Sequence, residues 1–215
     1  MGADLNQLRG LYAVTPDEDR TPRLMAMVAA ALAGGVRLLQ YRNKHAAAPL
    51  RRAQAAALLR LCHDSGASLI INDDLALTLE LGADGVHLGR DDTPGGIVAA
   101  RAALGPGKIL GISCYADLAL ADAAASAGAD YLAFGSMFVS ATKPDATRAP
   151  LELLGEARRR FDQPIAAIGG ITRRNAELTL AAGADLLAVV SDLFAGGDDA
   201  TGIAARAREY QQFFA

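Results

Sequence analysis

The feature that most constrains the fold is a short pattern that occurs four times, in which an alanine- or leucine-rich segment ends at glycine and an apolar run follows. The copies are ALAGGVRLLQ (31–40), ELGADGVHLG (80–89), ASAGADYLAF (125–134) and LAAGADLLAV (180–189). Glycine suits the left-handed residue that often ends a helix, and the apolar run is typical of a buried strand. Because the copies start 45 to 55 residues apart, each interval has room for two helix-to-strand units, about eight altogether.

Alternating strand and helix patterns can be placed along the whole chain. The expected strands are 10–15, 37–42, 68–72, 85–89, 108–113, 131–135, 164–169 and 186–191. The expected helices are near 23–33, 50–64, 74–81, 96–103, 117–127, 151–160, 173–182 and 200–212. Eight such units in 215 residues are typical of a minimal parallel barrel. We therefore predict an α/β fold, a single (β/α)8 TIM barrel, with residues 1–215 forming one catalytic domain.

An open, doubly wound sheet is the structural alternative. A sheet of that kind that binds a dinucleotide carries a GxGxxG turn after its first strand. The corresponding stretch here reads LYAVTPDED (11–19), which lacks the glycines. The barrel is therefore favoured.

Composition and charge narrow the classes of partner. The formal net charge is −3, which gives no general attraction to nucleic acid or to acidic membranes. The two cysteines, Cys62 and Cys114, lack CxxC spacing and fit reduced thiols. No apolar stretch approaches the roughly 18 residues that a membrane span needs. We expect a cytoplasmic protein with no nucleic-acid or membrane partner; a homo-oligomer is compatible with the sequence.

Polar residues follow the expected strands, where barrel enzymes place their chemistry. They are QYRNK (40–44), NDD (72–74), GRDD (89–92), Ser113, a long segment around Lys143, IGGIT (168–172) and VVS (189–191). The residue types in these segments indicate what the mouth of the barrel can bind.

The acidic residues point to a metal. Asp73 follows the third strand and Asp92 the fourth, and neighbouring strands lie about 4.8 Å apart. Two carboxylates, with water and phosphate oxygens, are a normal shell for Mg²⁺. By spacing alone Asp91 could replace Asp92. Capping of the helix near Leu75 accounts for Asp74, but one cap does not need all three polar residues.

The basic residues point to a leaving diphosphate. Arg42 and Lys44 alternate along the second strand exit and so share a face, and Lys143 lies in the segment after the sixth strand. Fixed positive charge and Mg²⁺ neutralise the charge that builds on a departing diphosphate. The histidines His45, His63 and His87 are scattered; no Ser-His-Asp or Cys-His arrangement is evident, and His87 is as readily a core residue as a pocket residue.

A second anion site of a different kind is expected at the last two strands. Gly169 and Gly170, with Val190 and Ser191, occupy exits where barrels commonly hold a phosphate through backbone N–H groups. The glycines are also compatible with a simple tight turn. Hydroxyls at 140–142 could close over the ligand. Two anion sites at one mouth suggest the joining of two phosphorylated molecules.

Seven short motifs carry a resemblance to a known family. QYRNK, INDD, DGVHLGRDD, GISC, SATKP, AIGGI and AVVS, in this order over residues 10–213, resemble the thiamine phosphate synthase family. The resemblance implies a transferase of class 2.5.1 that joins 4-amino-2-methyl-5-pyrimidinylmethyl diphosphate to a thiazole ethyl phosphate and releases pyrophosphate, with Mg²⁺. It also implies a dissociative mechanism, in which pyrophosphate leaves before the thiazole nitrogen attacks.

The resemblance assigns roles residue by residue. The implied pyrimidine diphosphate contacts are Gln40, Tyr41, Arg42, Asn43, Lys44, Asn72, Ser113 and Lys143, with catalytic roles for Arg42, Lys44, Ser113 and Lys143. The implied thiazole phosphate contacts are Ser140, Ala141, Thr142, Gly170, Val190 and Ser191. The implied Mg²⁺ ligands are Asp73 and Asp92, which selects Asp92 over Asp91.

The chain departs from the family pattern at two places, and two rival functions remain. Val139-Ser140 stands where the family often has Pro-Thr, and Tyr115 stands where a histidine is frequent after Ser113. A thiazole tautomerase would need a placed acid or base and gives no reason for paired aspartates beside cations. A non-catalytic sensor of phosphorylated ligands would bind without turnover.

Overall fold

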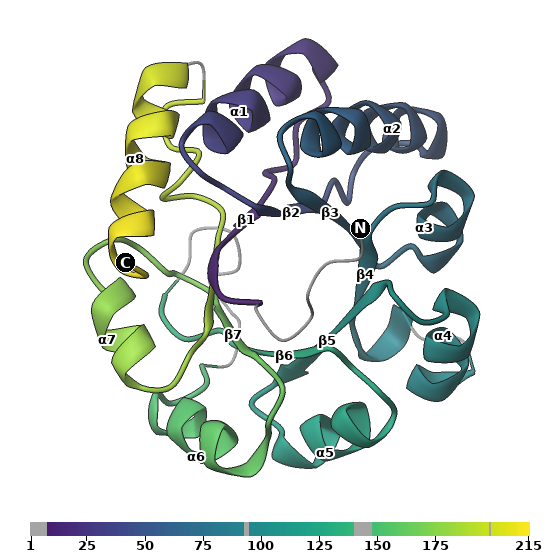
Figure 1. Ribbon diagram of the computed structural model, residues 1–215, viewed down its shortest axis with the longest axis vertical. Coiled ribbons are helices and arrows are strands. Elements are labelled where there is room, and N and C mark those ends of the chain that lie inside the picture. Colours follow the sequence, from purple (N-terminus) through teal and green to yellow (C-terminus); the bar gives the residue numbers. More distant parts are fainter. Residues whose placement is uncertain (1–7, 93–94, 140–147, 198) are drawn as a thin grey trace.

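The computed structural model describes residues 8–92, 95–139, 148–197 and 199–215, and within them the chain forms a closed parallel barrel in the strand order β1 to β8 (Figure 1). The strands are β1 (Gly10–Val14), β2 (Leu38–Tyr41), β3 (Ser68–Asn72), β4 (Gly85–Leu88), β5 (Ile109–Tyr115), β6 (Tyr131–Phe134), β7 (Ile165–Ile168) and β8 (Leu186–Val189). Closure comes from parallel pairing of β1 with β8, with Tyr12 opposite Ala188. This pairing confirms the barrel and removes the open-sheet alternative.

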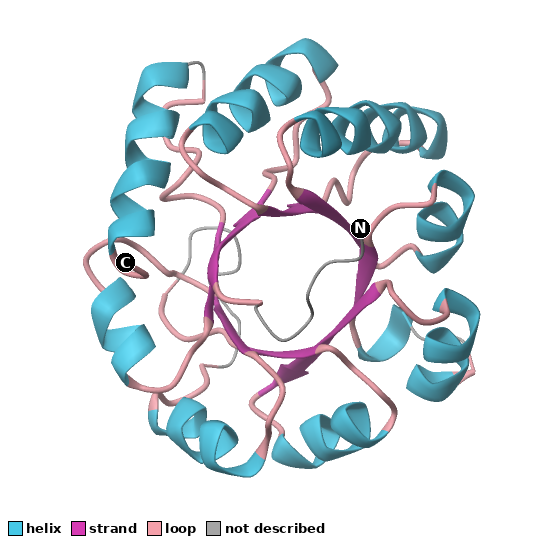
Figure 2. Ribbon diagram, in the orientation of Figure 1, coloured by secondary structure: helices cyan, strands magenta, loops and turns pink. Residues whose placement is uncertain are grey.

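The helices form a ring outside the strands (Figure 2). They are α1 (Thr21–Ala33), α2 (Ala48–Asp64), α3 (Leu75–Leu81), α4 (Gly96–Leu104), α5 (Leu118–Ser126), α6 (Glu152–Arg160), α7 (Ala176–Ala181) and α8 (Ala200–Gln212), with a 3₁₀ turn at Arg90–Asp92. Every expected strand and helix is present, with ends shifted by a few residues. Within the described ranges, no helix combines the length and the apolar character that crossing a membrane requires.

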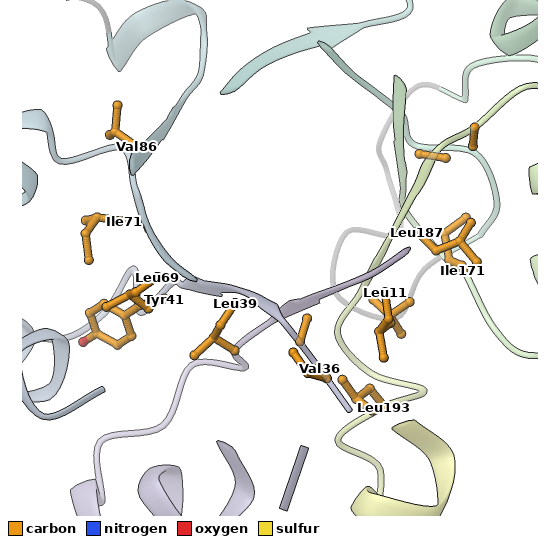
Figure 3. Packing of buried hydrophobic residues seen from close by; sticks show 14 of the residues in the cluster. Leu11, Val36, Leu39, Tyr41, Leu69, Ile71, Val86, Ile171, Leu187 and Leu193 are labelled. Carbon is orange, nitrogen blue, oxygen red and sulfur yellow. The ribbon is translucent and has the colours of Figure 1, made fainter. Parts of the chain in front are cut away.

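The core has two layers, because successive strand residues point alternately into the barrel and out toward the helices. The outer layer contains Leu39, Leu69 and Leu187, which lie on the helix side of the strands (Figure 3). The inner layer fills the barrel itself and includes Tyr12 and Tyr131, both almost completely buried. The inner layer forms the floor beneath the carboxyl ends of the strands.

Three of the four glycine motifs continue as Gly-Ala-Asp, and in each the aspartate ties neighbouring strands together at the amino-terminal end of the barrel. Its carboxylate accepts a backbone N–H near the start of the preceding strand and pairs with a basic side chain from the helix before that strand. The N–H bonds are Leu69 to Asp84 (2.7 Å), Leu110 to Asp130 (2.7 Å) and Ile165 to Asp185 (2.8 Å), and the basic partners are His63, Arg101 and Arg158. The sequence repeat is thus also a repeated structural contact.

We expect Asp130→Ala to lower the free energy of unfolding by about 2–3 kcal/mol, since it removes the acceptor for the Leu110 N–H and the partially buried partner of Arg101. The matched control is Asp122→Ala, because Asp122 pairs with Arg160 on the surface and should contribute less than about 1 kcal/mol. Urea denaturation of both variants measures the difference. Equal losses would contradict the structural role of the repeated aspartate.

Candidate active site

A cavity of about 950 Å³ opens at the carboxyl ends of the strands. Among the predicted site residues, those that line it are Gln40, Arg42, Lys44, Asn72, Asp73, Asp92, Ser113, Gly170, Val190 and Ser191. They come from β2, β3, β4, β5, β7 and β8 or the segments directly after them. The barrel therefore brings together ten residues that are up to 151 positions apart in the chain.

The two predicted cations beyond β2 are held in place by acceptors from the segment after β1. The Arg42 guanidinium lies 3.0 Å from Asp17 Oδ2, and the Lys44 backbone N–H donates to Asp17 Oδ1 over 2.7 Å. The Thr15 side chain accepts from the Arg42 N–H and donates to the Arg42 carbonyl oxygen. Asp17 and Thr15 were not singled out from the sequence, although the polar run after the first strand was the available signal.

The two predicted metal ligands lie beside each other. Asp73 has the left-handed backbone conformation, with φ of 64°, and its carboxylate lies 3.2 Å from Lys44 Nζ. The Asp92 carboxylate accepts the Gly89 N–H over 3.1 Å. Burial raises the pKa of Asp92, and the adjacent Asp73 carboxylate, with which it shares a hydrogen bond, raises it further. Two carboxyl groups thus lie together at one point of the mouth, with the Lys44 ammonium group beside Asp73.

This pair fits a hard cation that keeps most of its own water. Among the described residues, no three His, Cys, Asp or Glu side chains are grouped as a metal site would need. Asp73 and Asp92 nevertheless supply the one or two carboxylates that Mg²⁺ takes when phosphate and water complete its shell. Both aspartates face an open cavity large enough for such ligands.

Asp74, the third member of the polar run, has the helix-capping role expected from the sequence. Its side chain accepts the Leu77 N–H over 2.8 Å at the start of α3. The Arg51 guanidinium lies 3.5 Å from the same carboxylate. Asn72, Asp73 and Asp74 are therefore divided between the cavity wall, the carboxylate pair and the helix cap.

Tyr41 and Asn43 point away from the main cavity, as the alternation of β2 requires. They line a neighbouring cavity of about 640 Å³, which shares Lys44, Asn72, Asp73 and Asp92 with the larger one. The Tyr41 hydroxyl donates to Gln54, and the Asn43 amide N–H group contacts the same Gln54 oxygen. Their predicted contact with the pyrimidine diphosphate stays a prediction, and it is less direct than that of Gln40 or Arg42.

The glycines after β7 have a packing role of their own. Gly169 and Gly170 have φ of 98° and 64°. A Cβ atom on Gly170 would lie 2.4 Å from the Val139 carbonyl oxygen, so only glycine fits there. The Asn175 side chain accepts the Thr172 N–H and donates to the Gly170 carbonyl oxygen. The glycines thus form a tight turn that leaves Gly170 on the cavity wall, and phosphate binding there stays a prediction.

An ion cluster joins the β7 and β8 exits. The Arg173 guanidinium donates to Asp192 over 3.0 Å, and the Tyr210 hydroxyl donates to the same oxygen over 2.8 Å. Although burial opposes it, these hydrogen bonds lower the pKa of Asp192. Asp192 follows Ser191 directly, so the cluster positions Ser191 relative to the β7 turn. No local pattern in the sequence links Arg173 to Asp192, which lies 19 positions away.

Four predicted residues lie outside the described residues: Ser140, Ala141, Thr142 and Lys143. The neighbouring Val139 is exposed and lines the cavity, as does Tyr115, which stands at the family departure after β5. Tyr115 has φ of 55°, and the Arg90 guanidinium lies 5.5 Å from the centre of its ring. Arg90 adds a cation to the cavity wall that sequence reasoning passed over in the run GRDD.

His87 lies on the cavity floor and not on the surface. Its two ring nitrogens are 2.8 Å from the Tyr131 hydroxyl and 2.8 Å from the Ser113 hydroxyl. Burial lowers its pKa to about 4, against the opposing effect of the Asp73 carboxylate. His87 is therefore neutral at pH 7 and has both nitrogens engaged.

A closed (β/α)8 barrel with paired carboxylates and basic side chains around one cavity defines a TIM barrel with a charged mouth, the end at which enzymes of this fold hold their active sites. The family described as thiamine monophosphate synthase matches residues 11–193. Thiamine-phosphate synthases from Aromatoleum aromaticum and Methylobacillus flagellatus are each 54% identical, over 97% and 98% of this chain and 97% of each relative. The chain belongs to the thiamine monophosphate synthase family and is an enzyme, a transferase.

Comparison with solved structures leads to the same family. The structure of a thiamine phosphate pyrophosphorylase from Pyrococcus furiosus superimposes with a TM-score of 0.83 and 31% identity, covering 98% of this chain and 97% of that one. The family resemblance inferred from seven motifs is therefore confirmed. These relatives carry synthase or pyrophosphorylase names, which supports the synthase over the tautomerase and sensor alternatives.

The His87 environment predicts a pH dependence of stability. Below pH 6.5 the unfolded chain takes up a proton at this histidine, whereas the folded protein does so only near pH 4. The free energy of unfolding should therefore fall by about 3 kcal/mol from this group as the pH drops from 6.5 to 4. Denaturation of the wild type and of His87→Gln, which cannot be charged, measures the contribution as the difference in slope. Parallel slopes would contradict the assignment.

Proposed function

We propose that the protein joins 4-amino-2-methyl-5-pyrimidinylmethyl diphosphate to thiazole ethyl phosphate, giving thiamine monophosphate and pyrophosphate with Mg²⁺. The observation that carries this proposal is the grouping of Arg42, Lys44, Asp73 and Asp92 at one part of the cavity, while Gly170 and the β8 exit form another part. One part suits a metal-bound diphosphate and the other suits a monophosphate. Both substrates would then share a single cavity of about 950 Å³.

Asp73 and Asp92 would hold Mg²⁺, which when bound supplies positive charge to the diphosphate oxygens. Arg42 and Lys44 add fixed cations, and Lys143 is proposed as a third. Because Asp17 holds Arg42 and the Lys44 backbone before substrate binds, little reorganisation is needed when charge develops on the leaving group. Once pyrophosphate has left the site, Lys44 would return to its ion pair with Asp73, which is the arrangement found in this structure.

A dissociative order of events fits the groups that are present. Departure of pyrophosphate needs electrostatic stabilisation, and capture of the resulting cation by the thiazole nitrogen needs positioning and no strong base. The one histidine on the cavity wall, His87, is neutral and engaged at both ring nitrogens. We assign the chain's part in the reaction to binding, orientation and charge.

The thiazole phosphate would lie against Gly170, Val190 and Ser191, with hydroxyls from Ser140 and Thr142 proposed as further contacts. The Arg173–Asp192–Tyr210 cluster supports this assignment, because it fixes the distance between the two turns that would share the phosphate. We further propose that the protein acts in the cytoplasm, consistent with its two buried free cysteines, and that residues 1–215 act as one catalytic domain.

The direct test is formation of thiamine phosphate from the two synthetic substrates, with and without Mg²⁺. Oxidation of the product to fluorescent thiochrome provides the readout. Product that requires Mg²⁺ and both substrates supports the proposal. Absence of product from folded protein and intact substrates would overturn it.

The metal assignment predicts that Asp73→Asn and Asp92→Ala each lower kcat by about 10²-fold or more while thiazole phosphate binding is nearly unchanged. Asparagine is preferred at position 73 because it tolerates the left-handed backbone found there. Turnover at varied Mg²⁺ and calorimetric binding of thiazole phosphate measure the two effects. Asp122→Ala, on the surface of α5, is the control. Near wild-type turnover of both variants at low Mg²⁺ would exclude these ligands.

The monophosphate assignment predicts that Ser191→Asp raises KM for thiazole phosphate more than KM for the pyrimidine diphosphate, because it places negative charge beside the proposed phosphate. Ser191→Asn has nearly the same size without the charge and is the matched control. A rise of about tenfold or more in the aspartate variant alone is expected from one unscreened like-charge contact. Equal increases for both substrates would argue against two separate anion sites.

A further inference from the structure

A chain of hydrogen bonds crosses the interior of the barrel and ends at two predicted substrate contacts. Gln40 Nε2 lies 2.7 Å from the Tyr12 hydroxyl, which lies 2.7 Å from the Tyr131 hydroxyl. The Tyr131 hydroxyl lies 2.8 Å from His87 Nδ1, and His87 Nε2 lies 2.8 Å from Ser113 Oγ. The five residues come from five strands, and both ends of the chain line the cavity.

Packing fixes the rings that carry this chain. The rings of Tyr12 and Tyr131 meet edge to face at 5.7 Å, and the His87 ring stacks on Tyr131 at 5.6 Å. Gly111 lies opposite Tyr131 on the neighbouring strand, and a Cβ atom there would lie 1.9 Å from the Tyr131 ring. The glycine therefore makes room for the ring. The hydrogen-bonding atoms are therefore confined to each other, with the Gln40 amide in reach of both tyrosine hydroxyls.

The donor at Gln40 determines the direction of every bond that follows. An amide nitrogen can only donate, so the Tyr12 oxygen accepts from Gln40. The Tyr12 hydroxyl then donates its hydrogen bond to the Tyr131 oxygen. If Tyr131 donated to Tyr12 instead, the buried Tyr12 hydroxyl proton would have no acceptor among the described residues.

The same order reaches the histidine. The Tyr131 hydroxyl then donates a hydrogen bond to His87 Nδ1, and this nitrogen must be unprotonated to accept it. A neutral imidazole then carries its proton on Nε2 and donates to the Ser113 oxygen. Because this oxygen already accepts from His87, the Ser113 proton is left for a ligand in the cavity.

We propose that Tyr12, Tyr131 and His87 are positioning residues that fix Ser113 as a hydrogen-bond donor toward the departing diphosphate. This inference rests on the proposed function for the placement of the diphosphate at Ser113. A donor there would gain strength as negative charge accumulates on the leaving oxygens, which lowers the barrier more than it strengthens substrate binding.

The opposite proton order makes a distinguishable alternative. If the Gln40 amide were flipped so that its oxygen and nitrogen exchanged places, the oxygen would accept a hydrogen bond from Tyr12. Donor and acceptor would then be exchanged in every other bond of the network. His87 would then carry its proton on Nδ1 and accept from Ser113. Ser113 would present only lone pairs to an anionic ligand, which is unfavourable. The charge of the ligand and the orientation of Gln40 therefore favour the same order.

The first test reads the His87 tautomer directly. In ¹⁵N-histidine-labelled protein at pH 7, protonated and unprotonated ring nitrogens give well-separated resonances, and their couplings to the ring protons distinguish Nδ1 from Nε2. The chain has only three histidines, so His45→Gln and His63→Gln, both at exposed positions, assign the His87 signals by elimination. A proton on Nε2 is expected. A proton on Nδ1 would overturn the proposal, whatever the activity of the enzyme.

The second test asks whether the hydrogen-bond network of Tyr12, Tyr131 and His87 acts through Ser113. Tyr131→Phe keeps the ring and removes the proton donated to His87, so both histidine tautomers should become populated. We expect kcat to fall about twofold or more, in proportion to the fraction of His87 that no longer carries its proton on Nε2, with KM for thiazole phosphate unchanged. Ser113→Ala and the double variant complete the cycle. The double variant should be no slower than Ser113→Ala alone, whereas additive losses would contradict coupling.

A matched control separates positioning from core stability. Thr179→Val also removes a fully buried hydroxyl, which bonds to the carbonyl oxygen of Asn175 just before α7, and it should change stability without changing kcat or the His87 tautomer. If Tyr131→Phe behaves like this control, the interior chain only fills the barrel and the proposal is wrong. Failure of the wild type to form thiamine phosphate would instead overturn the proposed function, and the tautomer measurement would remain interpretable.

Discussion

The pairing of β1 with β8 is the contact on which the site depends. This pairing closes the sheet, so the carboxyl ends of all eight strands meet around one opening. Arg42, Asp92 and Ser191 lie far apart in the chain, yet each comes just after a strand and therefore reaches the same cavity. Without this pairing, the observed strand order would leave β1 and β8 at opposite edges of the sheet, and the residues after them could not line one cavity.

The two ends of the barrel use aspartate for different purposes. At the amino-terminal end, Asp84, Asp130 and Asp185 accept strand N–H groups and pair with basic side chains, so their charge is compensated and contributes to stability. At the mouth, Asp73 and Asp92 lie side by side, and burial together with this proximity raises the pKa of Asp92. Such an arrangement costs free energy in the empty protein and is reasonable where a cation binds. The aspartates that stabilise the barrel therefore lie at one end of the strands, and the aspartates of the candidate site lie at the other.

The barrel interior links the stable scaffold to the mouth. Tyr12 and Tyr131 fill space that apolar side chains would normally occupy, and their hydroxyls join Gln40 to Ser113 through His87. Each hydroxyl in this hydrogen-bond network has a single proton, so fixing the donor of one bond fixes the donor of every other bond. Two contacts outside the strands also position groups before a ligand binds. Asp17 holds the Arg42 guanidinium, and Asp192 holds the turn after β7 through Arg173. Preorganisation of this kind suits a reaction in which the protein contributes charge and position.

The sequence by itself determined the fold, the family and ten of the residues on the cavity wall. Glycine-ended helices and apolar runs are local signals, and the strand ends they define placed Asp73, Lys44 and Ser113 correctly at the mouth. Only the tertiary structure decided what each side chain contacts. It bonded Tyr41 to Gln54, paired Arg173 with Asp192, and placed His87 between Tyr131 and Ser113. The reason is physical: periodicity specifies a face of one strand, whereas a hydrogen bond depends on the register, twist and closure of several strands together.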